Sequence, residues 1–152
     1  MTHIKFCGLR TTADIDEAVR LGASYIGLVF FPRSPRHLTP EDAAALAAHA
    51  RGRVRSVAVT VDMDDAALEH IVSQVKPDLI QLHGSEPPAR VAEVRARFGL
   101  PVIEAIPVRT AEDITAARAY EGAADMLLFD AKPPVIPSAA RDHMDSSPTT
   151  RN

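Results

Sequence analysis

The stretch RSVAVTVDMDDAALEHIVSQVKPDLIQL, residues 55–82, decides the fold class. Residues 55–61 form an apolar, β-branched run typical of a strand, residues 64–75 place apolar side chains at helical spacing, and residues 79–82 form a second apolar run. Nearly unbroken apolar runs are typical of parallel strands that are covered on both faces. The stretch therefore predicts a strand, a helix and a second strand parallel to the first.

The same alternation extends in both directions along the chain. Thr39 before Pro40, followed by an acidic pair, predicts a helix start, because threonine caps a first turn and proline fits its first position. Further strands are predicted at residues 3–7, 25–30, 102–107 and 126–129, and further helices at residues 12–21, 40–49, 87–98 and 110–120.

Two architectures fit this order of elements: an open doubly wound sheet and a closed eight-stranded barrel. An open sheet that binds a nucleotide usually has a glycine-rich first turn, whereas the first turn here has only Gly8. The sequence therefore favours an α/β fold of the (β/α)8 TIM-barrel family, here with only about six β/α units.

The pattern of strands and helices stops after Lys132. Residues 133–152, PPVIPSAARDHMDSSPTTRN, are rich in Pro, Ser, Thr and Asp and have neither a helical nor a strand period. We therefore expect one incomplete barrel domain at residues 1–132 and an irregular, flexible tail at residues 133–152.

The composition is that of an ordinary soluble globular protein, with 46% hydrophobic residues, 24% charged residues and a formal net charge of −3. This charge gives no reason to expect a nucleic acid partner. The N-terminus does not resemble a signal peptide, and no apolar run approaches the roughly 18 residues of a membrane span. The single cysteine and the scattered histidines predict neither a disulfide nor a metal site. We expect a cytoplasmic protein without a membrane partner.

Chemically useful side chains collect at the predicted strand ends. In a parallel barrel the active site lies where the strands pass into the following loops, so these positions are the informative ones. They include an acid, a candidate base and cations suited to an anionic substrate. The residues are Cys7 with Gly8, Arg33 and Arg36, Asp62, Gln81 with His83, and Asp130 with Lys132.

Each of these residues also has a purely structural interpretation. Cys7 either packs as a small apolar side chain or acts as a thiolate, which requires positive charge nearby from Lys5, Arg36 or His83. Asp130 either caps the next loop or points into the barrel mouth.

The remaining polar side chains leave similar choices open. Arg33 and Arg36 lie in a proline-stiffened loop that either holds an anion or is simply solvated. His83 either donates to a nearby carbonyl or contacts the substrate. Lys5 points away from the side of Phe6 by strand alternation, towards an ion pair in the barrel interior.

Five stretches, in order, resemble the phosphoribosylanthranilate isomerase family, the cofactor-free barrel enzymes of tryptophan biosynthesis. Each short motif alone is weak, but their order and their places at strand ends make the resemblance specific, and it covers residues 4–134. The stretches are KFCGLR (5–10), GLVFFPRSPRHLTPEDA (27–43), VAVTVD (57–62), QLHGSE (81–86) and LLFDAKPP (127–134).

This resemblance implies an intramolecular aldose–ketose isomerisation, the Amadori rearrangement of N-(5′-phosphoribosyl)anthranilate, without cofactor or metal. In the family pattern Cys7 is the general base that removes the C2 proton, and Asp130 is the general acid that protonates the furanose oxygen. Arg36 corresponds to the group that holds the anthranilate carboxylate, and Gln81 and His83 correspond to further substrate-binding positions.

The resemblance also implies segments that this sequence lacks. Members of the family bind the substrate phosphate with glycine-rich loops after strands seven and eight, whereas residues 135–152 contain no glycine, so no phosphate-binding residue is predicted. Two interpretations follow: an active isomerase, rescued by self-association through exposed edges or by a C-terminal fragment, or an inactive truncated barrel fragment that needs such a complement. A barrel of the indole-glycerol-phosphate type is disfavoured, since that enzyme uses a lysine acid.

Overall fold

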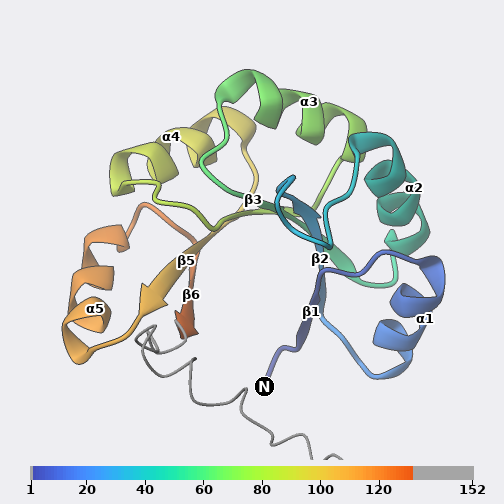
Figure 1. Ribbon diagram of the computed structural model, residues 1–152, viewed down its shortest axis with the longest axis horizontal. Helices are drawn as coiled ribbons and strands as arrows, with labels where there is room; N and C mark the ends of the chain where they lie inside the picture. The colour runs from blue at the N-terminus through green and yellow to red at the C-terminus, as the bar shows by residue number, and fades with distance from the viewer. Residues whose placement is uncertain (1, 132–152) are drawn as a thin grey trace, which may run out of the picture.

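The protein forms one curved sheet of six strands with helices along one face (Figure 1). This computed structural model describes residues 2–131. The strands are β1 (Lys5–Cys7), β2 (Tyr25–Phe30), β3 (Arg55–Thr60), β4 (Leu79–Leu82), β5 (Val102–Val108) and β6 (Met126–Ala131). The helices are α1 (Thr12–Arg20), α2 (Pro40–Ala50), α3 (Asp65–Val75), α4 (Pro88–Phe98), α5 (Ala111–Ala116) and the 3₁₀ helix η1 (Ala117–Tyr120).

All neighbouring strands are parallel, and they lie in the order of the sequence from β1 to β6. Figure 1 shows the sheet bent into an arc, with the helices on its convex side. The predicted barrel-family fold with about six β/α units is therefore confirmed as a half-barrel, in which β1 and β6 are the two edge strands.

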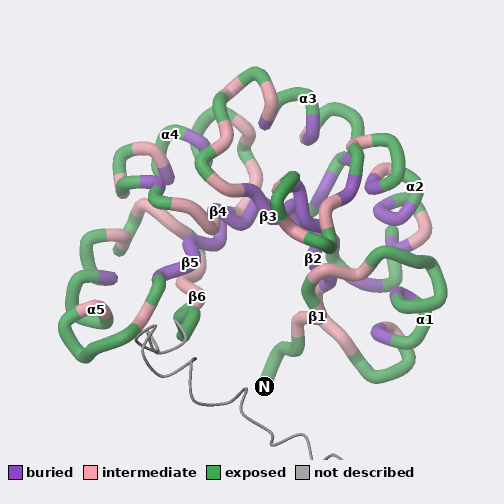
Figure 2. The backbone as a smooth tube through the Cα atoms, in the orientation of Figure 1, coloured by how far each residue is buried: buried purple, intermediate pink, exposed green. Residues whose placement is uncertain are grey.

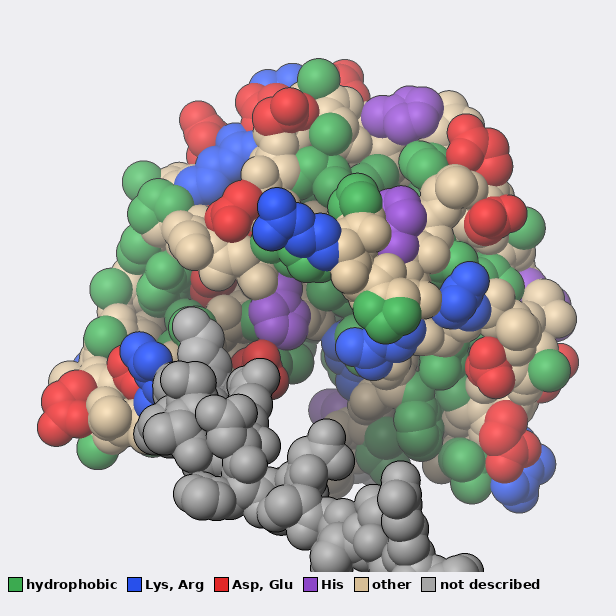
Figure 3. Space-filling model, in the orientation of Figure 1, with side chains coloured by type: hydrophobic (Ala, Val, Ile, Leu, Met, Phe, Trp, Pro, Cys, Tyr) green, Lys and Arg blue, Asp and Glu red, His purple; other side chains and the backbone are tan. Residues whose placement is uncertain are grey.

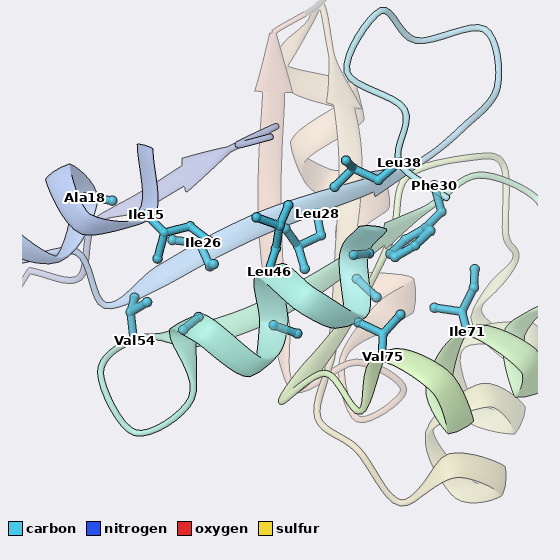
Figure 4. Packing of buried hydrophobic residues seen from close by; sticks show 14 residues of the cluster. Ile15, Ala18, Ile26, Leu28, Phe30, Leu38, Leu46, Val54, Ile71 and Val75 are labelled. Atoms are coloured by element: carbon cyan, nitrogen blue, oxygen red, sulfur yellow. The ribbon is translucent and has the colours of Figure 1, made fainter. Parts of the chain in front are cut away.

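Alternation along the strands separates an inner and an outer apolar layer. The concave side is lined by a cluster of Val29, Val57, Val59, Leu79 and Ile103. The convex side packs against the helices in two larger clusters, one of which joins α1 and α2 to β2 through residues such as Ile15, Ile26 and Leu46 (Figure 4). Because both faces of the central strands are covered, their apolar runs are nearly continuous.

The helix starts follow the predicted capping. Thr39 Oγ1 accepts from the Asp42 amide at 3.2 Å, and Pro40 occupies the first turn of α2. Thr11 caps α1 in the same way. The predicted helix at residues 110–120 differs, because its last turn tightens into η1, a common way to satisfy the backbone groups at a helix end.

Burial differs sharply between the middle of the sheet and its edges (Figure 2). Every residue of β4 is buried, whereas the last three residues of β6 are exposed and β1 has no buried residue. Phe129 of β6 is 53% exposed, and Leu21, just after α1, is 49% exposed. Phe129 is thus an exposed apolar side chain on an edge strand, while the predicted tail at residues 133–152 lies outside the described residues.

Candidate active site

Cys7 and Asp130 both face the concave side of the sheet, from its two opposite edges. Phe6 packs on the outer cluster beside α1, so its neighbour Cys7 points inward. Leu128 packs on the inner cluster, so Asp130, two residues later, points inward as well. Figure 3 shows this side as a hollow, with basic side chains towards the β1 side and acidic and histidine side chains towards the β6 side.

The Cys7 side chain lies over the backbone of Gly27 in the neighbouring strand. The two residues are paired in the β1–β2 register, and a Cβ added to Gly27 would stand 2.7 Å from the Cys7 sulfur. Any larger residue at position 27 would therefore displace the thiol. Cys7 is exposed, so of its two sequence-based interpretations the buried apolar filler does not fit.

Arg36 brings a positive charge to the Cys7 side of the hollow. Its guanidinium Nη1 donates to the Cys7 carbonyl at 3.4 Å, and its stem lies directly against Gly8. A Cβ at Gly8 would clash with that stem, and the φ of +82° at Gly8 also favours glycine. The tight turn after β1 and the SPR loop after β2 thus place Arg36 beside Cys7.

Asp130 meets His83 across the mouth of the half-barrel. His83 Nε2 and Asp130 Oδ2 are 3.2 Å apart, and the two side chains line a pocket of about 270 Å³. Gln81 lies behind His83, with its Nε2 3.0 Å from His83 Nδ1. Asp130 therefore points into the mouth, and His83 is placed at Asp130 rather than beside Cys7.

The loops that carry this pocket are tied together by two carboxylates. Glu86 accepts from the backbone amides of Asp62 and Gly84, both at 2.8 Å. Asp62 in turn accepts from the Ser85 amide at 2.7 Å and has a positive φ of 45°. Asp62, a strand-end acid in the sequence, thus makes its hydrogen bonds to the loop after β4.

Glu104 is a buried acid that sequence reasoning missed. It is 2% exposed on the outer face of β5, and its pKa is raised to about 8 by burial and by the nearby charges of Glu86 and Asp62. Tyr120 donates to the Glu86 carbonyl at 2.9 Å, and burial together with the charges of these two glutamates raises its pKa. A glutamate inside the apolar run VIEAI was the signal that could have revealed this cluster.

The other predicted cations take no defined part in the site. Lys5 faces the interior by alternation, but within the described residues it forms no ion pair, and Arg33 is exposed in its loop. Lys132 lies outside the described residues. Across residues 2–131, no group of three or more histidine, cysteine, aspartate or glutamate side chains is placed to hold a metal ion.

The sequence of the chain matches a known family model over most of its length. The sequence model described as N-(5'phosphoribosyl)anthranilate (PRA) isomerase covers residues 4–138. The chain belongs to the phosphoribosylanthranilate isomerase family. The resemblance seen in the five sequence stretches is therefore confirmed.

Curated relatives bear the name of this family. The N-(5'-phosphoribosyl)anthranilate isomerase of Rhizobium meliloti (strain 1021) is 53% identical over 133 residues, which are 88% of this chain and 62% of that relative. The isomerase of Brucella suis (strain ATCC 23445 / NCTC 10510) is 53% identical over 131 residues, or 86% and 59% of the two chains. The chain thus spans about three fifths of the length of the curated relatives it matches.

Solved structures of the family share the fold. The isomerase from Thermotoga maritima matches with a TM-score of 0.81 at 31% identity, covering 90% of this chain and 64% of that one. A second family structure, in complex with reduced 1-(o-carboxyphenylamino)-1-deoxyribulose 5-phosphate, has a TM-score of 0.79 at 30% identity and covers 87% and 66% of the two chains. No helix in residues 2–131 is long and apolar enough to span a membrane.

Proposed function

We propose that this chain carries the acid and base of an aldose–ketose isomerase that converts N-(5′-phosphoribosyl)anthranilate into 1-(2-carboxyphenylamino)-1-deoxyribulose 5-phosphate in tryptophan biosynthesis. The observation that carries the proposal is the placement of Cys7 and Asp130, which face one hollow from the two edge strands of the half-barrel. The names of the relatives at 53% identity support the choice of reaction.

The two side chains suit the two proton transfers of this rearrangement. Asp130 gives its proton to the furanose ring oxygen as the C1–O bond breaks, which leaves an iminium ion. Cys7 then takes the proton from C2, whose acidity the neighbouring iminium increases, and the enolamine that forms becomes the ketose. An acid and a base on opposite sides of the sugar can act in sequence without neutralising each other.

The charge beside Cys7 supports an anionic aromatic substrate. Arg36 holds a guanidinium at the Cys7 end of the hollow, where it can bind the anthranilate carboxylate with two parallel hydrogen bonds. His83 and Asp130 occupy the opposite side, at the sugar end of the proposed substrate. No cofactor or metal takes part in the proposed reaction.

The experiment is a turnover assay that follows the fluorescence of freshly prepared substrate. Cys7→Ala should lower turnover by about 10²–10⁴-fold, because it removes the proposed general base, and Asp130→Asn should do the same for the acid. Arg36→Met should instead raise KM with a smaller loss of kcat, because it removes a binding charge. Undiminished turnover by Cys7→Ala would refute the assigned base.

We also propose that the chain on its own turns over little substrate, and that it gains activity when a C-terminal fragment of the family pairs with its open edges. Phe129 is 53% exposed on the edge strand β6, and the chain spans 62% of its Rhizobium meliloti relative. The alternative partner is a second copy of the chain, and size measurement during the assay separates the two. The cytosol is the proposed location, as for other enzymes of amino-acid biosynthesis that act on soluble substrates.

A further inference from the structure

A chain of hydrogen bonds crosses the inner face of the half-barrel from β4 to β6. It runs from Gln81 through His83 to Asp130, with donor–acceptor distances of 3.0 and 3.2 Å. The intervening strand β5 contributes Ala105, which lines the same pocket as His83 and Asp130. The small alanine side chain leaves room for the imidazole to reach past one strand to the next.

Gln81 itself is sealed from solvent and from the hollow. It is 1% exposed and is paired in register with Val59 on one side and Ile103 on the other, inside the inner apolar layer. Its Oε1 has no hydrogen-bond partner in the described part of the chain. An unsatisfied buried amide oxygen costs about 1–3 kcal/mol, so a glutamine inside the inner apolar layer lowers the stability of the packing there. Apolar packing alone therefore does not account for Gln81.

The orientation of the Gln81 amide selects one tautomer of the imidazole. With its Nε2 towards His83 the amide can only donate, so this orientation requires an unprotonated Nδ1 on His83. In neutral His83 the ring proton is then on Nε2, which donates to Asp130. We propose that Gln81 is a positioning residue that holds His83 in the Nε2–H form and directs this N–H towards the Asp130 carboxylate, rather than a residue that contacts substrate.

In the reaction, this role of Gln81 would assist proton donation by Asp130, an inference that rests on the proposed function. When the O–H bond of Asp130 breaks and the proton passes to the furanose oxygen, a carboxylate is left at the mouth of the half-barrel. The His83 N–H already points at that carboxylate and stabilises it as it forms. Gln81 contributes by keeping the donor in place before the reaction begins.

The test measures the ring proton of His83 directly and does not depend on turnover. Long-range ¹H–¹⁵N NMR at pH 8 on the labelled full chain identifies which ring nitrogen carries the proton, with Gln81→Leu and Gln81→Met as variants and the urea-unfolded chain as reference. The unsubstituted chain should show only the Nε2–H form. Both variants should show a measurable Nδ1–H form beside the Nε2–H form that Asp130 still accepts from, with an undiminished urea midpoint.

Two results would overturn the proposal: a mixture of forms in the unsubstituted chain, or a pure Nε2–H form that persists in both variants. A turnover assay of the complemented chain, that is, the chain mixed with a C-terminal fragment of the family, tests whether Gln81 affects the reaction. Gln81→Leu should lower kcat about tenfold, part of the roughly 10²–10⁴-fold contribution of a general acid, without changing KM. A raised KM at unchanged kcat would identify Gln81 as a substrate contact instead. Absence of any turnover would count against the proposed function and leave the NMR result standing.

Discussion

The middle strands of this sheet provide most of its packing, whereas its edge strands carry the proposed acid and base. Strands β3 and β4 are buried almost throughout and hold apolar side chains against both layers of the core. Strands β1 and β6 have no buried residue, yet they hold Cys7 and Asp130, the proposed base and acid. The chemistry of this half-barrel thus lies on the strands with the least packing, so stability and activity should respond to different substitutions.

The largest expected effect is on chemistry at an edge. Cys7→Ala should lower turnover in the complemented chain by about 10²–10⁴-fold, the usual contribution of a general base. Because the thiol is exposed, the urea midpoint of the variant should match that of the unsubstituted chain. A matched loss of stability and turnover would break the comparison, since it would make Cys7 a packing residue.

Next in size is a cavity in the middle of the sheet. Ile80 of β4 is fully buried among Val91, Val94 and Val102, so Ile80→Ala should lower the free energy of unfolding by about 2–5 kcal/mol. Phe129→Ala on β6 is the matched control and should cost less than about 0.5 kcal/mol, because this ring is half exposed. Urea unfolding of both variants measures the contrast, and equal losses would contradict it.

Glu104 should make stability depend on pH. Its pKa is raised to about 8 in the folded chain, so stability is complete below the ordinary glutamate pKa and falls as pH rises towards 8. Glu104→Gln keeps the shape without the charge and should therefore be more stable than the unsubstituted chain at pH 8, by roughly 2–4 kcal/mol. At pH 4 the difference should vanish. If the urea midpoints of the unsubstituted chain and of Glu104→Gln differ by the same amount from pH 4 to pH 8, ionisation of the buried Glu104 does not cost stability.

The smallest effect on folding is expected at the exposed edge itself. Phe129→Lys should leave the free energy of unfolding within about 0.5 kcal/mol of its original value, because the side chain is exposed. It should nevertheless reduce self-association, since a charge on an edge strand disfavours pairing with another chain. Light scattering across a concentration series checks this, and unchanged association would point to contacts elsewhere.

Much of the fold could be predicted from local signals. The apolar run of β2 and the threonine–proline start of α2 are properties of short stretches, and both lie where they were predicted. The apolar runs did not distinguish β6 from β4, because burial depends on what covers a strand and not on its own residues. The meeting of His83 with Asp130, 47 residues apart, depends on the curvature of the sheet and on a small residue at position 105.

For the candidate site too, the individual residues could be predicted from the sequence, but the contacts between them could not. Strand-end positions identified Cys7, Arg36 and Asp130, because parallel strands deliver their C-terminal ends to one rim. Which groups become neighbours could not be predicted: Arg36 was one of three cations considered for Cys7, and its approach depends on the bare backbone of Gly8. Glu104 could not be predicted as part of an acidic cluster, because its neighbours in the sequence are apolar. The acids that lie near it, Glu86 and Asp62, belong to other segments of the chain.

The central claim is that the edges of this half-barrel hold a working acid and base that act once the sheet is extended. The most direct measurement is turnover by the full chain, alone and titrated with a fragment carrying the last two β/α units of the Rhizobium meliloti relative. We predict that activity rises with the fragment to a one-to-one plateau and falls by about 10²–10⁴-fold with Cys7→Ala. Full turnover without the fragment, or undiminished turnover by Cys7→Ala, would contradict the account.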